Sequence, residues 1–197
     1  MELPSWANPD ESRPAPVPLL LVQAFVNTWD AEHGTDLLDR AETAGPWLRE
    51  AGLAATGASL GEPELRQARE VRESLRALLA HNGGGTRPAA EELVPLGALA
   101  RAGSPKLSVD PAGHILLATE PQTLAGGLAG LLLIVRDAQQ QGTWQRLKIC
   151  RNPECRWAFY DRSPTRRGTW CDMATCGNMI KNRNFRARRK QQPWPPG

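Results

Sequence analysis

Two cysteine pairs decide the fold of the C-terminal part of the chain, in the stretch 150-CRNPECRWAFYDRSPTRRGTWCDMATC-176. Each pair encloses four residues, and fifteen residues separate Cys155 from Cys171. Two such pairs can fold back so that four thiolates meet at tetrahedral angles, about 2.3 Å from one Zn²⁺. Asn152 and Pro153 suit the tight turn inside the first pair. The stretch therefore predicts one structural zinc ion, held by Cys150, Cys155, Cys171 and Cys176.

Other roles for these cysteines are less well supported by the pattern. They could be buried apolar side chains or form two disulfides, but paired spacing in a cytosolic chain favours a metal. A catalytic metal needs an open coordination position, and four thiolates leave none. The histidines lie outside the stretch and are typical of surface or capping residues, namely His33, His81 and His114.

The fifteen-residue spacer places aromatic residues around a basic segment, residues 162–168. This pattern predicts a hairpin inside the spacer with a basic tip. The chain after Cys176 has a helical pattern, and we expect Phe185 to pack toward that hairpin. A knuckle, a hairpin and a helix that carries the last ligand would together form a treble-clef-like finger.

The helix expected after Cys176 has an unusual charge pattern. Six cations and no acid lie within residues 181–190. A solvated helix face usually mixes both signs, because acids relieve the repulsion between cations. The pattern therefore favours contact with nucleic acid over a simple solvated face. With the basic tip of the spacer, the candidate DNA contacts are Arg162, Arg166, Arg167, Lys181, Arg183, Arg186, Arg188, Arg189 and Lys190.

The net charge of +3 for 197 residues is a cancellation between two unlike parts. The first 145 residues hold 11 Lys and Arg against 18 Asp and Glu, and the remainder holds 13 against 3. Net charges of −7 and +10 are the asymmetry expected of a nucleic-acid-contacting part joined to a different body.

Hydrophobic periodicity predicts a mainly helical body before the finger. Residues 19–26 suit a buried helix, with a buried strand as the alternative. A short helix capped by Thr43, with Pro46 in its first turn, should end at Gly52. Residues 124–140 form a core helix, and residues 106–118 predict a β-hairpin around a Pro-Ala-Gly turn.

The clearest helix begins near Pro63 and has an apolar face that recurs every three or four residues. Its charged side chains, Arg72 and Arg76 among them, are expected on the outward face. The fold class is therefore α+β, mainly α. We expect a flexible N-terminal arm over residues 1–16, a mainly helical domain over 17–142, the zinc finger over 143–192 and a Pro-rich tail over 193–197.

Both parts of the chain resemble a known protein family. The C-terminal part is similar to the CGNR zinc finger of bacterial proteins in Cys150, Cys155, Trp157, Phe159, Asp161, Ser163, Trp170, Cys171, Cys176, Gly177, Asn178, Lys181, Phe185, Arg186 and Arg188. In that family the finger follows an α-rich domain called ABATE. The body resembles this domain in Phe25-Val-Asn27-Thr28, Trp47-Leu48, Gly52-Leu53, Arg72-Glu73 and Leu75-Arg76. The resemblance implies a regulator of transcription that responds to stress and binds DNA.

One residue departs from the family motif. Met179 follows Cys176-Gly177-Asn178 where the motif has arginine. The zinc ligands are unaffected. Any contact made by the arginine is absent here or is transferred to Arg183 or Lys181.

Two functions of different classes fit the sequence. The first is a zinc-dependent transcriptional regulator, in which the basic helix contacts duplex DNA and the body senses a signal or mediates assembly. The alternative is a zinc-ribbon adaptor that binds RNA or an acidic protein partner. In the alternative, Trp157, Phe159 and Tyr160 would be exposed stacking platforms rather than part of the finger core.

The sequence contains none of the motifs that mark common enzyme classes, and we expect no enzymatic activity. A small-molecule effector could still bind the body. Polar side chains within apolar segments often orient a ligand, which makes Asn27, Thr28, Arg72 and Arg76 the candidate pocket residues. Simple capping and surface charge are the alternative roles of these four.

The longest apolar stretch, residues 124–135, is interrupted by three glycines and is shorter than the roughly 20 residues of a membrane-spanning helix. The start of the sequence lacks the basic and apolar regions of a secretory signal. We therefore expect a cytoplasmic protein without membrane contact, and a homodimer is compatible with the sequence.

Overall fold

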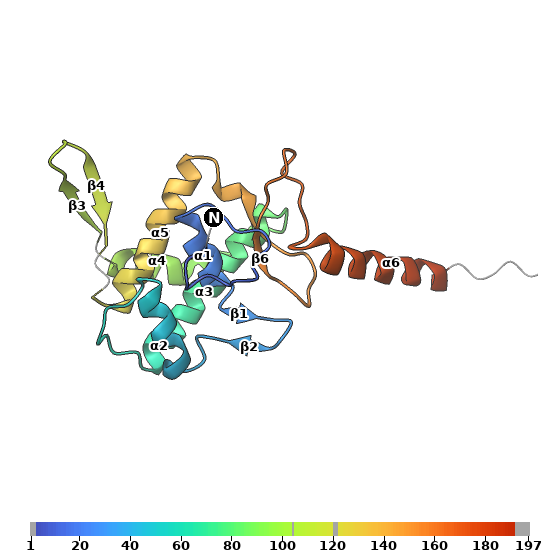
Figure 1. Cartoon of the computed structure of the whole chain (residues 1–197), viewed down its shortest axis with the longest axis horizontal. Coiled ribbons are helices and arrows are strands. Elements are labelled where there is room, and N and C mark those ends of the chain that lie inside the picture. Colours follow the sequence, from blue (N-terminus) through green and yellow to red (C-terminus); the bar gives the residue numbers. More distant parts are fainter. Residues whose placement is uncertain (1–2, 104, 120–121, 192–197) are drawn as a thin grey trace, which may run out of the picture.

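The computed structural model describes residues 3–103, 105–119 and 122–191, and Figure 1 shows their arrangement. These residues form six α-helices, which are α1 (Leu19–Val26), α2 (Ala41–Glu50), α3 (Glu62–Asn82), α4 (Val94–Ala102), α5 (Leu124–Gln140) and α6 (Asn178–Gln191). Shorter helical turns are η1 (Glu91–Leu93), η2 (Trp144–Arg146) and η3 (Met173–Gly177). The predicted fold class, α+β and mainly α, is confirmed.

The strands form small antiparallel pairs rather than one sheet. They are β1 (Trp29–Asp30) with β2 (Thr35–Asp36), β3 (Lys106–Val109) with β4 (Ile115–Ala118), and β5 (Leu147–Ile149) with β6 (Ala158–Tyr160). The predicted hairpin over residues 106–118 is therefore present as β3 and β4, and it extends from the body (Figure 1).

Helix α1 lies at the centre of the body and contacts α3, α5 and β6. Leu20, Val22, Phe25 and Val26 are all buried, which is expected of an apolar helix surrounded by other elements. The choice between a helix and a strand for residues 19–26 is thus decided in favour of the helix. Its last turns place polar side chains toward the finger.

Helix α5 approaches the chain after α2 very closely at Gly127. A Cβ atom at this position would lie 1.8 Å from the carbonyl oxygen of Leu53, so a larger residue requires the backbones to separate. The Thr123 side chain caps the helix by accepting a hydrogen bond from the backbone nitrogen of Gly126 at 3.2 Å.

The expectation for the start of α2 was wrong. The helix begins at Ala41, so Pro46 lies inside it, and Thr43 donates its hydroxyl to the carbonyl oxygens of Leu37 and Arg40. The predicted end was correct, because Gly52 has a φ of +69°.

Helix α3 has the predicted apolar face but not the predicted outward one. Arg72 and Arg76 are only 4% and 1% exposed. The segment after α1 supplies acceptors for Arg72, whereas Arg76 donates to the last residue of α1 and to the finger. The sequence period of α3 cannot predict this burial, because the residues that bury the two arginines belong to other segments.

The N-terminal segment, residues 3–16, packs between the body and the finger, which differs from the flexible arm expected for residues 1–16. Ala15 is fully buried, and its backbone nitrogen donates to the side chain of Gln23 at 2.7 Å. The carbonyl oxygen of Arg13 accepts from the backbone nitrogen of Tyr160 at 3.0 Å. The segment is therefore held by both of its neighbours.

Two separate apolar clusters divide the finger. Strands β5 and β6 contribute Leu147, Ile149, Ala158 and Tyr160 to the large core of the body. The cysteines form a second cluster with Phe159, Trp157 and Trp170. The base of the finger is thus built into the body, and only its outer part has a core of its own.

None of the helices in the described part of the chain is long and apolar enough to cross a membrane. The Pro-rich tail expected over residues 193–197 lies outside the described residues, as does residue 192.

Candidate metal centre and its surroundings

The four cysteine sulfurs meet as the spacing predicts. All of them lie within 4.8 Å of one another, Cys155 Sγ is 3.6 Å from Cys171 Sγ, and Cys171 Sγ is 3.8 Å from Cys176 Sγ. Four thiolates at about 2.3 Å from a tetrahedral Zn²⁺ would be about 3.8 Å apart, whereas a disulfide needs about 2.05 Å. The cluster therefore fits one structural zinc ion.

The first cysteine pair sits in a turn between β5 and β6. The backbone nitrogen of Cys150 donates to the carbonyl of Trp157 at 2.8 Å, which extends the strand pairing by one step. The backbone nitrogens of Cys155 and Arg156 both donate to the carbonyl of Asn152 at 3.0 Å. Arg156 completes the turn with a positive φ of 53°. The turn therefore brings both sulfurs to one side.

Asp172 fixes the turn that contains the second cysteine pair. Its side chain accepts from the backbone nitrogen of Thr175 at 2.8 Å, and its carbonyl accepts from that of Gly177 at 3.1 Å. The wide turn η3 therefore presents Cys176 immediately before α6, as expected of a helix that carries the last ligand.

Asn152 joins the two pairs and was not identified from the sequence as a site residue. Its side-chain nitrogen lies 3.5 Å from Cys176 Sγ and 3.9 Å from Met179 Sδ, and the residue is buried. A donor beside a thiolate sulfur stabilises its negative charge. Its place inside the first pair was the signal, but the sequence suggested only a turn-forming role.

The pKa values of the neighbouring thiols also favour a bound cation. Hydrogen bonds from the thiols of Cys155 and Cys171 lower the pKa of Cys150 to about 2. The hydrogen bond to Cys150 raises the pKa of Cys155 to about 12, and bonds to Cys150 and Cys155 raise the pKa of Cys171. Cys150, Cys155 and Cys171 can lose their protons together when a dication offsets their repulsion.

The aromatic residues of the spacer do not form the predicted hairpin. Residues 162–170 form a loop without strand pairing, and the hairpin instead flanks the first cysteine pair as β5 and β6. Phe159 and Tyr160 are buried and Trp157 is half-buried. Phe185 is 60% exposed rather than packed on the finger, because α6 extends away from it (Figure 1).

A buried ion pair holds the basic loop. Lys148 Nζ lies 2.8 Å from Asp161 Oδ2 and 2.5 Å from the carbonyl oxygen of Arg166. Burial alone would raise the pKa of Asp161, but hydrogen bonds from Lys148 and Ser163 hold it below its ordinary value. A Cβ on Gly168 would lie 2.7 Å from this carboxylate, so glycine permits the loop to close on it. The sequence signal, a lysine between the apolar Leu147 and Ile149, was missed.

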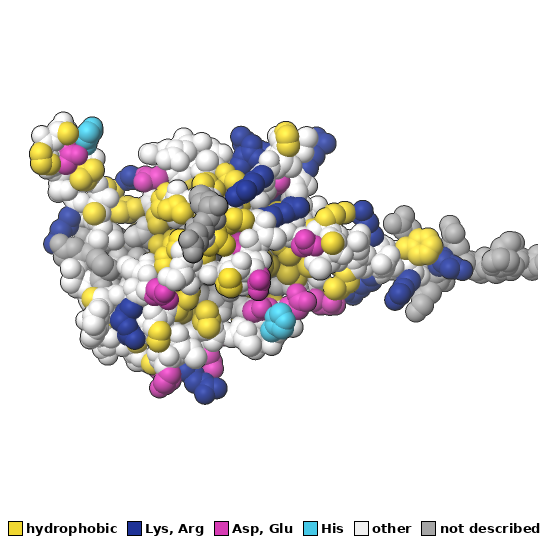
Figure 2. Space-filling view, in the orientation of Figure 1, with side chains coloured by type: hydrophobic (Ala, Val, Ile, Leu, Met, Phe, Trp, Pro, Cys, Tyr) yellow, Lys and Arg dark blue, Asp and Glu magenta, His cyan; other side chains and the backbone are white. Residues whose placement is uncertain are grey.

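The predicted DNA contacts fall into two groups, and Lys and Arg side chains gather over both in Figure 2. The loop carries Arg162, Arg166 and Arg167, and α6 carries the exposed Lys181, Arg183, Arg186 and Arg189. Arg183 is paired with Glu154 at 3.2 Å. The side chains of Arg188 and Lys190 lie outside the described residues.

A cavity of about 460 Å³ opens beside the loop. Arg13 lines it together with Arg162 and Arg167, and the hydroxyl residues Ser163 and Thr165 lie between them. The Ser163 hydroxyl is buried and has no hydrogen-bond partner among the described residues. Arg13 lies more than 140 residues away in the sequence, so no local pattern could have identified it.

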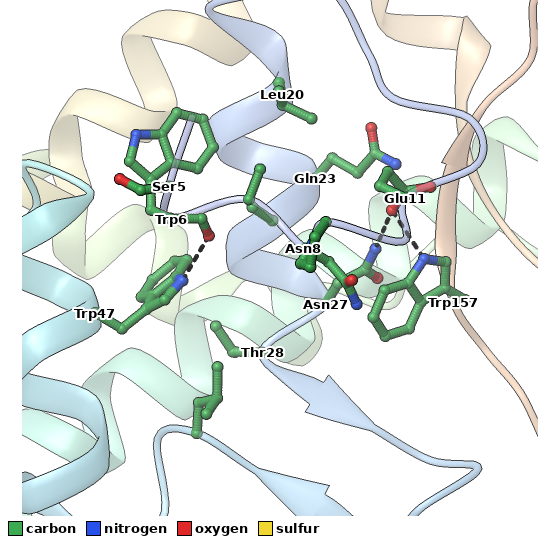
Figure 3. Close-up of a pocket in the computed structure, with 14 residues that line it drawn as sticks. Ser5, Trp6, Asn8, Glu11, Leu20, Gln23, Asn27, Thr28, Trp47 and Trp157 are labelled. Atoms are coloured by element: carbon green, nitrogen blue, oxygen red, sulfur yellow. Dashed lines mark hydrogen bonds between the residues drawn. The ribbon is translucent and has the colours of Figure 1, made fainter. Parts of the chain in front are cut away.

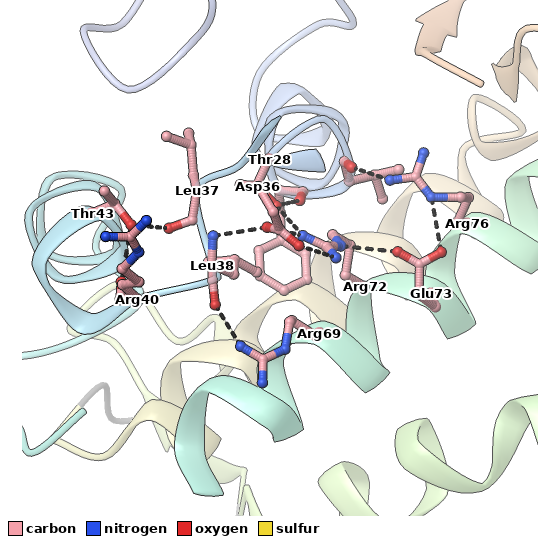
Figure 4. A network of polar contacts seen from close by, with 12 residues as sticks. Thr28, Asp36, Leu37, Leu38, Arg40, Thr43, Arg69, Arg72, Glu73 and Arg76 are labelled. Atoms are coloured by element: carbon pink, nitrogen blue, oxygen red, sulfur yellow. Dashed lines mark hydrogen bonds and ion pairs between the residues drawn. The ribbon is translucent and has the colours of Figure 1, made fainter. Parts of the chain in front are cut away.

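The predicted pocket residues on α3 take part in a polar network (Figure 4). Arg72 makes a bidentate ion pair with Asp36 at 2.6 and 2.8 Å and also donates to Thr28. Arg76 pairs with Glu73 and donates to the carbonyl oxygens of Val26 and Arg156, at 2.7 and 2.9 Å. Burial lowers the pKa of Arg76 to about 10.

Asn27 and Thr28, by contrast, line a cavity of about 300 Å³ (Figure 3). Asn27 binds the finger directly, because its side chain accepts from the backbone nitrogen of Ala158 at 2.7 Å and donates to the carbonyl of the same residue at 2.9 Å. Thr28 also accepts from Arg72 and so joins this cavity to the polar network. Arg76 lines a second cavity of about 300 Å³ together with Glu73 and Arg156.

Comparison with protein families agrees with this architecture. A model described as "Putative stress-induced transcription regulator" (ABATE) matches residues 20–139, and the CGNR zinc finger model matches residues 146–189. None of the curated proteins matches the chain. The ABATE match spans more than half of the sequence and precedes the finger in the predicted order. The chain therefore belongs to the ABATE family and carries a CGNR zinc finger at its C-terminal side.

Proposed function

We propose that this protein is a zinc-dependent transcriptional regulator whose finger binds duplex DNA and whose N-terminal domain senses a signal. The observation that carries the proposal is helix α6, which extends from the zinc cluster with exposed cations and contains no acidic residue. The matches to a family of regulators and to a zinc finger are consistent with this proposal.

The length of α6 suits the proposed contact. Its 14 residues span about 21 Å, and the major groove of DNA is about 12 Å wide and admits a helix. Exposed Lys181, Arg186 and Arg189 would contact phosphates along it. Arg183 is already paired with Glu154, so we propose Lys181 as the substitute for the family arginine that Met179 replaces.

The cavity beside the finger loop supports a second phosphate contact. Guanidinium groups such as those of Arg13, Arg162 and Arg167 bind phosphate oxygens well. Because the loop and α6 both adjoin the zinc cluster, one DNA duplex could contact both of them. This arrangement would make the N-terminal segment part of the DNA-binding surface.

The adaptor alternative is less well supported. RNA stacking needs exposed aromatic faces, and the structure buries Phe159 and Tyr160. An acidic protein partner remains compatible with α6. We propose no catalytic role, because both families are described by regulatory or zinc-finger functions.

The proposal also covers the assembly and the location of the protein. Exposed Leu107, Val109 and Ile115 share one face of the β3–β4 hairpin, which supports a homodimer that sedimentation can test. A cytoplasmic location is proposed because thiolate ligands persist in a reducing compartment.

Fluorescence anisotropy with labelled duplex DNA tests the main proposal. The logarithm of the affinity should fall with the logarithm of the salt concentration by about 0.9 for each phosphate neutralised. Cys176→Ser should lose both the zinc and the binding. Salt-independent binding, tighter binding of single-stranded RNA, or DNA binding that survives the loss of zinc would each overturn it.

A further inference from the structure

The cavity in Figure 3 lies where three parts of the chain meet. Trp6, Asn8 and Glu11 come from the N-terminal segment, Leu20, Gln23, Asn27 and Trp47 from the body, and Trp157 from the finger. Its volume of about 300 Å³ is at the lower end of the range for small-molecule sites. A ligand here would touch the body and the finger at once.

The cavity contains a carboxylate with no counter-charge. Glu11 Oε2 accepts hydrogen bonds from Trp157 Nε1 at 2.9 Å and from the Asn27 side chain at 3.3 Å, and Oε1 accepts from the backbone nitrogen of Arg13 at 3.1 Å. All three donors are neutral. In the described part of the chain, Glu11 forms no ion pair, and burial raises its pKa.

Aromatic side chains form the walls and are held in place. Trp47 Nε1 donates to the carbonyl oxygen of Trp6 at 2.8 Å, and Trp157 Nε1 donates to Glu11. Figure 3 shows Trp6 and Trp47 on one side of the cavity, with Glu11, Asn27 and Trp157 on the other. The cavity therefore has an aromatic end and an anionic end.

We propose that this cavity binds a small organic cation, with its ammonium group at Glu11 and its apolar part against Trp6 and Trp47. A cation would supply the counter-charge that Glu11 lacks, and Trp157 at the same end of the cavity adds an aromatic ring of the kind that attracts ammonium groups. An organic anion would meet the carboxylate charge, and a neutral ligand would leave that charge uncompensated.

The same contacts link the ligand to the finger. Trp157 lies two residues after the zinc ligand Cys155, and Asn27 binds the backbone of Ala158 in β6. An ammonium at Glu11 would therefore be linked to the base of the finger through the contacts of Trp157 and Asn27. An effect of the cation on DNA affinity follows only if the proposed DNA-binding function also holds, whereas the binding of the cation does not depend on it.

Calorimetry on the zinc-loaded full chain tests the proposal with two matched pairs of probes. Phenethylamine is compared with phenethyl alcohol, and choline with its neutral carbon isostere dimethylbutanol. We expect at least one cation to bind and to exceed its neutral partner by on the order of tenfold, the range for a charged hydrogen bond from the primary ammonium or a cation–π contact of the quaternary one. The proposal is overturned if neither cation binds, or if neither cation binds more tightly than its neutral partner.

Variants locate the site. Glu11→Gln should weaken the binding of the cation by roughly tenfold to a hundredfold and leave the neutral partner unchanged. Trp6→Leu should weaken both members of a pair, because it removes an aromatic wall. Asp10→Asn is the control, since it removes the same charge one residue away from an exposed side chain that does not line the cavity. An equal effect of Asp10→Asn and Glu11→Gln would contradict a site at Glu11.

The two proposals fail separately. If the cation binds and duplex DNA does not, the proposed function falls and the cavity assignment stands. If DNA binds and neither cation does, the opposite holds. If both bind, the DNA affinity measured with and without the cation shows whether the contacts of Trp157 and Asn27 transmit its binding.

Discussion

The base of the finger and helix α6 belong to the same zinc module but differ in what holds them. Strands β5 and β6 place Leu147, Ile149 and Ala158 in the core of the body, and α1 and α3 hydrogen-bond to the backbone of this region. Helix α6 extends away and meets the rest of the protein at the zinc cluster and the Arg183–Glu154 pair (Figure 1). The body thus positions the finger, and the metal positions the helix.

Removal of zinc tests this comparison with the largest expected effect. Zinc binding contributes on the order of 10 kcal/mol in small fingers. With a chelator, or in Cys176→Ser, amide hydrogen exchange should lose protection in η3 and α6 while β5 and β6 stay protected by the body. Metal content should fall from one zinc per chain to none.

The wild-type chain with zinc restored is the control for this experiment. Loss of protection in β5 and β6 together with α6 would mean that the body does not hold the base of the finger by itself.

The buried ion pair tests the link between the base and the basic loop. Lys148→Met removes the cation and leaves the Asp161 carboxylate buried, which should cost about 3–5 kcal/mol in the free energy of unfolding. Because the pKa of Asp161 is lowered in the folded state, its stabilisation is present above its ordinary value of 3.8 and is lost as the pH falls below it.

Urea unfolding at neutral pH measures this cost. Lys148→Met combined with Asp161→Leu is the matched variant, and it should recover much of the stability because no buried charge is left unpaired. A loss of less than about 1 kcal/mol for Lys148→Met alone would show that the pair does not hold the loop.

The smallest stability effect is expected on α6. Arg186→Gln should change the free energy of unfolding by less than about 0.5 kcal/mol, because the side chain is exposed. It should lower the salt slope of DNA binding by about 0.9. Arg40→Gln on the body removes the same charge from an exposed site and should leave the slope unchanged. Similar slopes for both variants would indicate that α6 does not contact phosphates.

The sequence predicted the features that local chemistry determines. Zinc ligands need a particular spacing, so Cys150 to Cys176 could be assigned before any fold was known. Gly52 at a helix end and the apolar face of α3 follow from backbone geometry and period. The family resemblance added the order of the two domains, which the comparison confirmed.

Features that depend on distant partners were missed. Arg72 and Arg76 are buried because α1, the segment after it and the finger pack against them, and no sequence period marks these distant partners. The spacer hairpin was misplaced because its aromatic residues pair with residues before the first cysteine rather than after it. Phe185 was expected to be packed because it is apolar, yet α6 leaves it without a neighbouring core.

The hydrogen bond from Tyr160 to Arg13 has a consequence for synthesis. Arg13 is synthesised well before Tyr160, whose backbone nitrogen donates to its carbonyl oxygen. Arg162 and Pro14 are likewise separated by 148 residues. Contacts of such long sequence separation form slowly, because a large loop must close first. Arg13 and Pro14 therefore lack these partners until the finger has been synthesised, and the Glu11 cavity is completed only when Trp157 is in place.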